Sequence, residues 1–430
     1  MNSLSKLALV LTFCTGMIAC SGGKAVKGDY GVVPLPQEVT LTNGNPFVLS
    51  PSTKIFYPEG NDKMKKNAEF LASYIKEITG YELATATGQP GKGISLVIDQ
   101  SIQNPEGYQL TVSDNGIRIA GSTDAGVFYG IQTLRKSIPA TAQGMNVELP
   151  AATINDYPRF AYRGMMLDVS RHFFPVDSVK TYLDILALHN QNTFHWHLSD
   201  DQGWRIEIKK YPELAEIGGQ LPNNGRKGGY YTQEEFKDLV NYAKERFITI
   251  IPEVDIPGHT AAIFAAYPDF KNAVKFKTNV NIPGQAFNAL DVDDPKAMQF
   301  TEDVIAELAA LAPGNYIHIG GDEAIGLPHD KFVRFINKTR EIVLKNGKKM
   351  VGWQETARAD ISEGDVIQHW IYLKQKNEDS SKKKDNIPAE YKEIMALFAE
   401  FMKEAPKDPG LGISKKAKVI LSPSGYVYLD

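Results

Sequence analysis

The stretch His318-Ile319-Gly320-Gly321-Asp322-Glu323 places two adjacent carboxylates directly after a short apolar strand, residues 316–319. Adjacent acidic residues alone mean little, because most such pairs are solvated surface and Asp200-Asp201 is another pair in this chain. The two glycines distinguish the first pair, since glycine lets the backbone turn sharply or approach another group closely at the end of a strand. We therefore expect Asp322 and Glu323 to project into a pocket.

Six further apolar segments around this stretch predict the other strands of a parallel sheet, because helical stretches separate them. Polar or aromatic residues follow each segment at its carboxyl end. In a (β/α)8 barrel the loops at those ends build the active site. The sequence therefore predicts an α/β fold with a TIM-type barrel, whose candidate strands are residues 164–169, 193–198, 248–254, 316–319, 350–353, 366–369 and 419–421.

The residues before the barrel show both helical and strand patterns. Residues 67–79 and 124–135 predict helices, and residues 94–98 and 109–112 alternate as strands do. The turn Asp114-Asn115-Gly116 predicts a hairpin between residues 109–112 and 117–119. We expect a small α+β domain over residues 31–150, without a cluster of catalytic residue types, and a barrel domain over residues 151–430.

Composition and charge exclude several classes of protein. The chain has 430 residues, of which 43% are hydrophobic and 10% aromatic, so a disordered chain is excluded. The net charge is only −4 and the basic residues form no long stripe, so nucleic acid is not expected as a partner.

The first twenty residues resemble a bacterial lipoprotein signal. Lys6 precedes an apolar run at residues 7–13, and Ala19 stands directly before Cys20. We expect a signal segment over residues 1–20, a linker over residues 21–30 and lipid attachment at Cys20. The mature protein would then be exported to the periplasm or outer membrane, with the lipid as its only membrane contact. An ordinary secretory signal, and hence a secreted protein, is the alternative.

Together, five blocks of sequence resemble glycoside hydrolase family 20, the β-N-acetylhexosaminidases. The resemblance runs from about residue 30 to the last residue. It implies an exo-acting enzyme that removes terminal, non-reducing, β-linked N-acetylglucosamine or N-acetylgalactosamine from glycans, with retention and with assistance from the substrate. The blocks are Arg163-Gly-Met-Met-Leu-Asp-Val-Ser-Arg-His172, Phe194-His-Trp-His-Leu-Ser-Asp-Asp-Gln-Gly-Trp-Arg205, Pro252-Glu-Val-Asp-Ile-Pro-Gly-His259, His318 to Glu323, and Ser422-Pro-Ser-Gly-Tyr-Val-Tyr-Leu-Asp430.

The resemblance also implies catalytic roles. Glu323 matches the proton donor, and Asp322 matches the carboxylate that orients the 2-acetamido group of the substrate. Tyr428 matches the tyrosine that donates to the acetamido oxygen. Asp200 and His259 match a hydrogen-bonded relay to Glu323. A neighbouring ionised carboxylate raises the pKa of an acid, so Asp322 could keep Glu323 protonated near neutral pH.

Four more residues match sugar-binding positions of the family. Arg171 matches the arginine that grips the hydroxyls of the terminal sugar. Trp353 and Trp370 match aromatic walls around the acetamido methyl group, and Asp430 matches a carboxylate that binds a hydroxyl.

His195 and His197 alternate within one strand, and we interpret them as facing opposite sides, in barrel packing or behind the site. No helix carries paired histidines one turn apart, and both cysteines, Cys14 and Cys20, lie in the signal segment. We therefore expect no metal and no cofactor.

The sequence offers seven candidate strands where a (β/α)8 barrel has eight, and nothing matches the eighth strand and helix of the family. We expect a barrel that is incomplete at its C-terminal side, in a fragment of a longer protein. Two alternatives to the function stay open: a non-catalytic carbohydrate-binding relative and a hexosaminidase that releases a disaccharide. The sequence does not indicate the oligomeric state.

Overall fold

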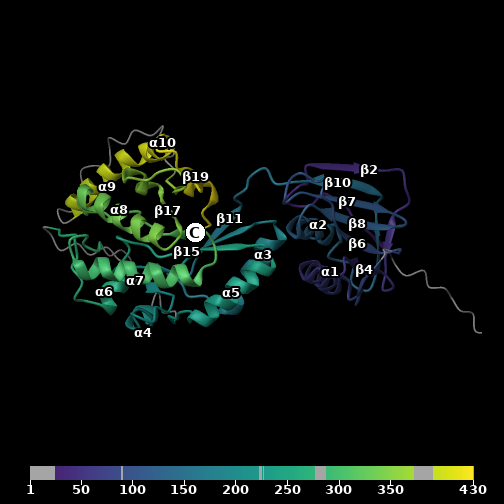
Figure 1. Ribbon diagram of the computed structural model, residues 1–430, viewed down its shortest axis with the longest axis horizontal. Coiled ribbons are helices and arrows are strands. Elements are labelled where there is room, and N and C mark those ends of the chain that lie inside the picture. Colours follow the sequence, from purple (N-terminus) through teal and green to yellow (C-terminus); the bar gives the residue numbers. More distant parts are fainter. Residues whose placement is uncertain are drawn as a thin grey trace, which may run out of the picture. The chain divides into compact units, whose positions relative to one another are not determined.

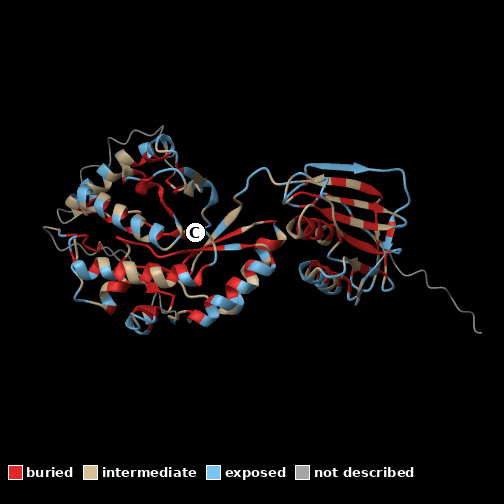
Figure 2. Ribbon diagram, in the orientation of Figure 1, coloured by how far each residue is buried: buried red, intermediate tan, exposed pale blue. Residues whose placement is uncertain are grey.

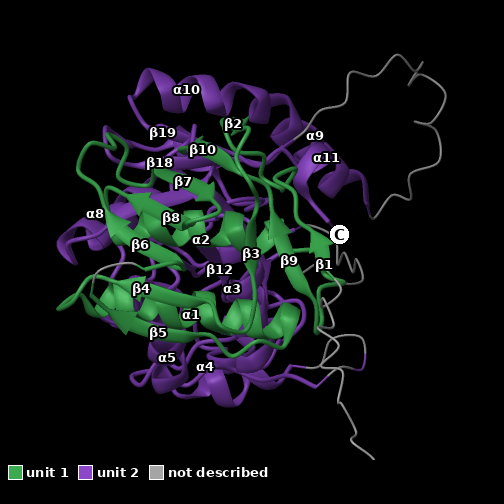
Figure 3. Cartoon of the chain, turned by 90° about the vertical axis from the view of Figure 1, so that its right-hand side faces the viewer, with its two compact units in different colours: residues 1–157 green, residues 158–430 purple. Residues whose placement is uncertain are grey.

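The computed structural model describes residues 25–88, 91–221, 225, 227–276, 287–371 and 391–429. The chain divides into two compact units, Met1–Tyr157 and Pro158–Asp430 (Figure 3). This division lies seven residues beyond the predicted boundary at residue 150, because strand β10 (Ala152–Asp156) pairs with β2 (Glu38–Leu41) and β7 (Tyr108–Ser113) and so belongs to the first unit. Cys20, the rest of the signal segment and Asp430 lie outside the described residues.

The first unit is an α+β domain with two sheets. Its seven-stranded sheet has the order β2-β10-β7-β8-β6-β4-β5, and a three-stranded sheet has the order β1-β9-β3. The predicted hairpin is present, since β7 and β8 pair antiparallel around Asn115. The remaining elements are β1 (Ala25–Lys27), β3 (Phe47–Leu49), β4 (Lys54–Tyr57), β5 (Ala84–Thr87), β6 (Ile94–Ile98), β8 (Gly116–Gly121), β9 (Asn146–Leu149), α1 (Asp62–Thr79) and α2 (Asp124–Ser137).

Helix α1 has a cap at each end. The side chain of Asn61 accepts a hydrogen bond from the Met64 backbone N–H, and Gly80 ends the helix in the left-handed region at φ 79°. Helix α2 lies on β7 and β8, so close at Gly130 that an added Cβ would lie 2.5 Å from Ile119 Cγ2. The two helices cover one face of the large sheet (Figure 1).

The second unit is built on one parallel sheet with the strand order β11-β12-β15-β16-β17-β18-β19. All seven predicted strands are present within two residues of their predicted ends. The strands are β11 (Gly164–Asp168), β12 (Thr193–His197), β15 (Thr249–Glu253), β16 (Tyr316–His318), β17 (Lys349–Trp353), β18 (Val366–His369) and β19 (Lys418–Leu421); a short hairpin, β13 (Ser199–Asp200) and β14 (Gly203–Trp204), follows β12.

Crossover helices connect these strands and lie outside the sheet, where neighbouring helices pack on one another (Figure 1). Local sequence fixes their starts: Thr232 and Glu235 form a capping box before α5, and Asp294 caps α7, which begins at Pro295. The helices are α3 (Val176–Leu188), α4 (Glu213–Glu216), α5 (Gln233–Glu245), α6 (Ala261–Ala266), α7 (Pro295–Leu311), α8 (His329–Lys345), α9 (Lys392–Glu404), α10 (Asp408–Ser414) and α11 (Ser424–Val427).

Burial follows the position of each strand in the sheet (Figure 2). All five residues of β12 are buried, as are four of five in β15 and in β17. The outermost strands β11 and β19 are only partly buried, and Leu421 of β19 is 74% exposed. Within the described residues no ladder joins β19 to β11, so the seven strands form an open, curled sheet. The predicted TIM-type barrel, incomplete and preceded by a small α+β domain, is confirmed.

None of the described helices combines the length and the apolar character that a membrane-spanning segment requires.

Candidate active site

The loop after β16 turns sharply at its two glycines. Gly320 and Gly321 have φ values of 68° and 92°, a region that residues with a Cβ rarely adopt. Gly320 also packs directly on Asp255, where an added Cβ would lie 2.6 Å from the Asp255 Cα. The Gly321 backbone N–H donates to Asp255 Oδ1 at 3.0 Å. The glycine pair therefore lets the chain pass over Asp255 and turn before Asp322 and Glu323.

His259 faces both carboxylates of the pair. Its Nε2 lies 3.7 Å from Asp322 Oδ2 and 3.8 Å from Glu323 Oε2. His259 and Glu323 both have left-handed backbones, with φ of 51° and 37°. Such conformations cost about 1–3 kcal/mol each in a residue other than glycine and occur most often at functional sites. Three other described residues share this conformation away from the site, so the strained pair adds support to a functional role and does not carry it alone.

The environment sets the charges of this group. Burial, and then the neighbouring Asp322, raise the pKa of Glu323 above its usual value, so this carboxyl holds a proton to higher pH than an exposed glutamate. Burial alone would lower the pKa of His259, but Asp200 and Asp322 outweigh it and raise that pKa well above its usual value. The environment thus favours the proton on Glu323 and the cationic form of His259.

Asp200 is almost fully buried, with 1% of its surface exposed. Its Oδ1 lies 3.2 Å from His259 Nδ1, and its Oδ2 lies 2.7 Å from Arg171 Nη2 and 3.1 Å from His197 Nε2. Burial would raise the pKa of Asp200, but its cationic neighbours lower it far below the usual value. Asp200 is therefore an anion, and it joins His259 to His197 on β12 and to Arg171 in the loop after β11.

Arg171 has two carboxylate partners, Asp200 and Asp168, the latter at 2.8 Å from Nη1. Its side chain nevertheless remains 39% exposed. The two carboxylates fix the plane of the guanidinium, and part of it stays accessible to a ligand.

Glu253, at the end of β15, is fully buried and anionic. Its Oε2 lies 2.6 Å from both His195 Nε2 and His197 Nδ1, and Trp353 Nε1 donates to its Oε1 at 2.8 Å. The prediction that His195 and His197 face opposite sides is wrong, because side chains two residues apart in a strand point the same way. Burial would raise the pKa of Glu253, but His197, His318 and His195 together hold it well below its usual value.

The two tryptophans occupy neighbouring strand ends. Trp353 is 4% exposed and its ring meets Trp370 edge to face, with centroids 6.4 Å apart. Trp370 is partly buried, and its Nε1 lies 3.3 Å from both carboxylate oxygens of the buried Glu355. Burial, and then Asp322, raise the pKa of Glu355 well above its usual value. Trp370 thus has more accessible surface than Trp353 to offer a ligand.

Tyr428 directly follows α11 and is partly buried. The segment that carries it is tied to the end of β18, since the Ser424 backbone N–H donates to the Trp370 carbonyl at 2.7 Å.

The structure therefore brings Asp200, His259, Asp322, Glu323 and Arg171 into one connected group. Sequence reasoning missed the groups behind it, above all Glu253. The sequence offered only part of the signal, the two-residue spacing that places both β12 histidines on one face. The register that sets Glu253 beside His197 comes from the structure.

Several of these side chains are close enough to share a metal ion, with candidate ligand atoms within 4.8 Å of one another. The hydrogen bonds described above account for most of this closeness: Glu253 already accepts from two imidazoles and an indole, and Asp200 is bound by two histidines and an arginine. The groups are His195–Glu253–His318, His197–Glu253–Asp255, Asp200–Asp255–His259 and His259–Asp322–Glu323.

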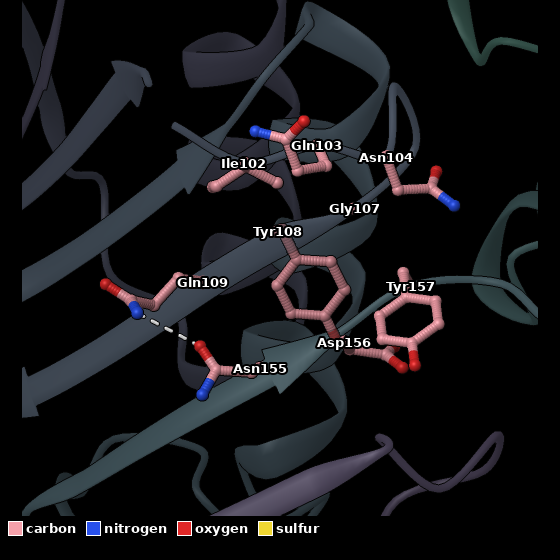
Figure 4. A pocket seen from close by; sticks show the side chains of 9 residues that line it. All are labelled: Ile102, Gln103, Asn104, Gly107, Tyr108, Gln109, Asn155, Asp156 and Tyr157. Carbon is pink, nitrogen blue, oxygen red and sulfur yellow. Dashed lines mark hydrogen bonds between the residues drawn. The ribbon is translucent and has the colours of Figure 1, made fainter. Parts of the chain in front are cut away.

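A cavity of about 330 Å³ lies elsewhere, in the first unit, beside the ends of β7 and β10 (Figure 4). Two of its amides bind each other, since Gln109 Nε2 donates to Asn155 Oδ1 at 3.0 Å. Tyr108, Asp156 and Tyr157 also line it. The residues that line this cavity include no carboxylate pair and no histidine. We therefore place the candidate active site at the strand ends of the second unit.

Comparison with known proteins agrees with this placement. Residues 160–331 match the model of the glycosyl hydrolase family 20 catalytic domain, and residues 29–157 match that of glycosyl hydrolase family 20, domain 2. A beta-hexosaminidase of Porphyromonas gingivalis is 35% identical over 369 residues, covering 79% of this chain and 47% of that protein. A beta-N-acetylhexosaminidase of Cellulomonas fimi is 33% identical over 348 residues, covering 80% of this chain and 69% of that protein.

A solved structure is similar over most of the chain: the N-acetyl-beta-hexosaminidase of Streptomyces plicatus in complex with Thio-NAglucal. It superimposes with a TM-score of 0.76 and 37% identity, covering 93% of this chain and 75% of the Streptomyces chain. The chain thus spans about half of the Porphyromonas relative's length and about two thirds to three quarters of the other two.

Proposed function

Because the chain belongs to glycosyl hydrolase family 20, we propose that it is an exo-acting β-N-acetylhexosaminidase. Its substrates are glycans that end in β-linked N-acetylglucosamine or N-acetylgalactosamine. The names of its relatives support this substrate class. The observation that carries the proposal is the connected group of Asp200, His259, Asp322 and Glu323, in which His259 faces two adjacent carboxyl groups and burial raises the pKa of Glu323.

In the first step Glu323 gives its proton to the glycosidic oxygen, and the bond between that oxygen and the anomeric carbon breaks. The carbonyl oxygen of the substrate's own acetamido group attacks the anomeric carbon and forms an oxazolinium ion. Asp322 orients the acetamido N–H and balances the positive charge that develops on the ring. A carboxylate fixed in advance beside that charge stabilises the transition state without reorganisation.

In the second step water attacks the anomeric carbon from the face that the leaving group vacated. The carboxylate of Glu323 takes the proton of that water, and the acetamido carbonyl is released. Two inversions at one carbon give net retention. His259, oriented by Asp200, supports the carboxylate form of Glu323 between the two steps, since its Nε2 faces that side chain.

The remaining residues bind the sugar. The accessible part of Arg171 donates to hydroxyls of the terminal residue, while Asp168 and Asp200 fix its direction. Trp370 packs against the acetamido methyl, with Trp353 behind it. Tyr428 donates to the acetamido oxygen.

The test is hydrolysis of 4-nitrophenyl N-acetyl-β-glucosaminide and of the matching β-glucoside, by the wild type and by Glu323→Gln. We expect turnover of the acetamido substrate alone, lost in the variant. A folded wild-type protein that binds the sugar but turns over neither substrate would instead favour a carbohydrate-binding relative. Chromatography of products from a longer oligosaccharide distinguishes release of a monosaccharide from release of a disaccharide.

We further propose that the protein is exported and lipidated at Cys20. The motif before that cysteine is the support. Metabolic labelling with a tritiated fatty acid should mark the wild type and not Cys20→Ser; equal labelling of both would contradict the proposal.

A further inference from the structure

His197 lies between two buried anions in the middle of the candidate site. Its Nδ1 is 2.6 Å from Glu253 Oε2, and its Nε2 is 3.1 Å from Asp200 Oδ2. All three side chains are at most 2% exposed, so solvent replaces neither contact. Asp200 in turn holds His259 Nδ1 at 3.2 Å, which turns the other ring nitrogen of His259 toward Glu323. A continuous line of contacts therefore runs from Glu253 to the acid of the site.

The charged groups around His197 come from several elements. Glu253 lies on β15, Asp168 ends β11, and Arg171 Nη1 lies 3.1 Å from His197 Nε2. Burial and Arg171 disfavour a charged imidazole, whereas Glu253, Asp168 and Asp200 favour it. The carboxylates prevail and raise the pKa of His197 well above its usual value, which favours the charged ring with a donor at each nitrogen. His195 on the same strand is the other titratable neighbour.

His195 offers a natural comparison. It lies on the same strand and face, is equally buried, and contacts the same oxygen of Glu253 at the same 2.6 Å. Its other nitrogen, Nδ1, is buried and has no hydrogen-bond partner among the described residues. Both histidines satisfy Glu253, but only His197 continues to Asp200.

We propose that His197 is a positioning residue, whose Nε2 holds the buried carboxylate of Asp200 in place and thereby keeps His259 in the orientation that faces Glu323. The inference rests on the proposed hexosaminidase function for its effect on rate. Its structural part, the orientation of His259, does not depend on that function.

Two amide substitutions separate positioning from simple packing. In His197→Gln the amide nitrogen takes the place of Nε2 and keeps a donor toward Asp200. In His197→Asn it takes the place of Nδ1 and keeps a donor toward Glu253. Because hydrogen bonds to charged groups are worth a factor of about 10 to 100, we expect kcat of the Asn variant to fall by that factor with KM unchanged, and kcat of the Gln variant to stay within about threefold of wild type. A packing role at Glu253 predicts the reverse order, and that result would overturn the proposal.

His195→Asn is the matched control, since it removes a contact to Glu253 without touching Asp200. We expect His195→Asn to lower the melting temperature and to leave kcat within about threefold of wild type. The limbs of its pH profile should stay in place. An equal loss of kcat in His195→Asn and His197→Asn would show that any damage to the Glu253 cluster suffices, and would also overturn the proposal.

A second readout does not need activity. The ring nitrogens of His259 can be followed by ¹⁵N NMR of histidine-labelled protein, assigned with His259→Gln. We expect His197→Asn to shift the His259 signals, and His197→Gln and His195→Asn to leave them in place. If the signals shift as expected while the wild type hydrolyses no hexosaminide, the proposed function fails and the positioning role stands. Unchanged His259 signals in His197→Asn refute the positioning role, whatever the rate.

Discussion

Replacing Gly320 by alanine should destabilise the second unit more than a glycine-to-alanine change at an open turn with a similar φ. The left-handed backbone at φ 68° costs an alanine about 1–2 kcal/mol. The new Cβ would also overlap Asp255, whose Cα lies only 2.6 Å from its ideal position. Overpacking of a rigid, buried site typically adds about 1–3 kcal/mol. We therefore expect a total loss of about 2–5 kcal/mol in the free energy of unfolding.

Gly347 provides the control. It has nearly the same φ, 71°, but an added Cβ would meet nothing within 4 Å. Gly347→Ala should therefore cost only the backbone component, about 1–2 kcal/mol. The difference between the two variants, about 1–3 kcal/mol, isolates the contact with Asp255.

Urea unfolding followed by tryptophan fluorescence measures this difference in the right part of the molecule. All four tryptophans, Trp196, Trp204, Trp353 and Trp370, lie in the second unit. Equal destabilisation by Gly320→Ala and Gly347→Ala would refute the close approach of the glycine loop to Asp255, and with it our account of how Asp322 and Glu323 are placed.

Three other substitutions test the charges and contacts of the site. In Asp322→Asn the charge that raises the pKa of Glu323 is lost, so the alkaline limb of kcat against pH should move to lower pH; a limb that stays in place would contradict the charge coupling. Burial, and then Asp322, raise the pKa of Asp255, so the contribution of this group to stability falls as pH rises above about 4. Asp255→Asn should gain stability relative to wild type over that range, and urea unfolding at several pH values would reveal a constant difference if this is wrong. Trp353→Phe removes a donor from buried Glu253 and should cost about 1–3 kcal/mol in urea unfolding; no loss would show that the bond is unimportant.

Local patterns sufficed for the framework of the second unit. Each strand is a short apolar run between helical stretches, and parallel strands have their carboxyl ends at one edge of the sheet, so Asp200, His259 and Glu323 could be expected together. The small domain was harder to predict, because β2 is a four-residue strand that is exposed on both faces and β10 follows the predicted domain boundary.

The buried layer beneath the site could not be predicted in the same way. Glu253 gains its meaning from the register that places it beside His197 and from the indole of Trp353, one hundred residues away. Such convergence depends on strand order and register. The shared face of His195 and His197, by contrast, follows from the two-residue repeat of a strand, and our opposite interpretation was an error of reasoning.

The central claim is that Glu323 is the general acid, and leaving groups of different acidity test it most directly. Wild type and Glu323→Gln would be compared on N-acetyl-β-glucosaminides with a sugar, a 4-nitrophenyl or a 2,4-dinitrophenyl leaving group. A good leaving group departs without a proton, whereas a sugar needs one. Our account predicts that the variant loses most of its kcat/KM on the sugar substrate and least on the dinitrophenyl substrate. An equal loss on all three would contradict it.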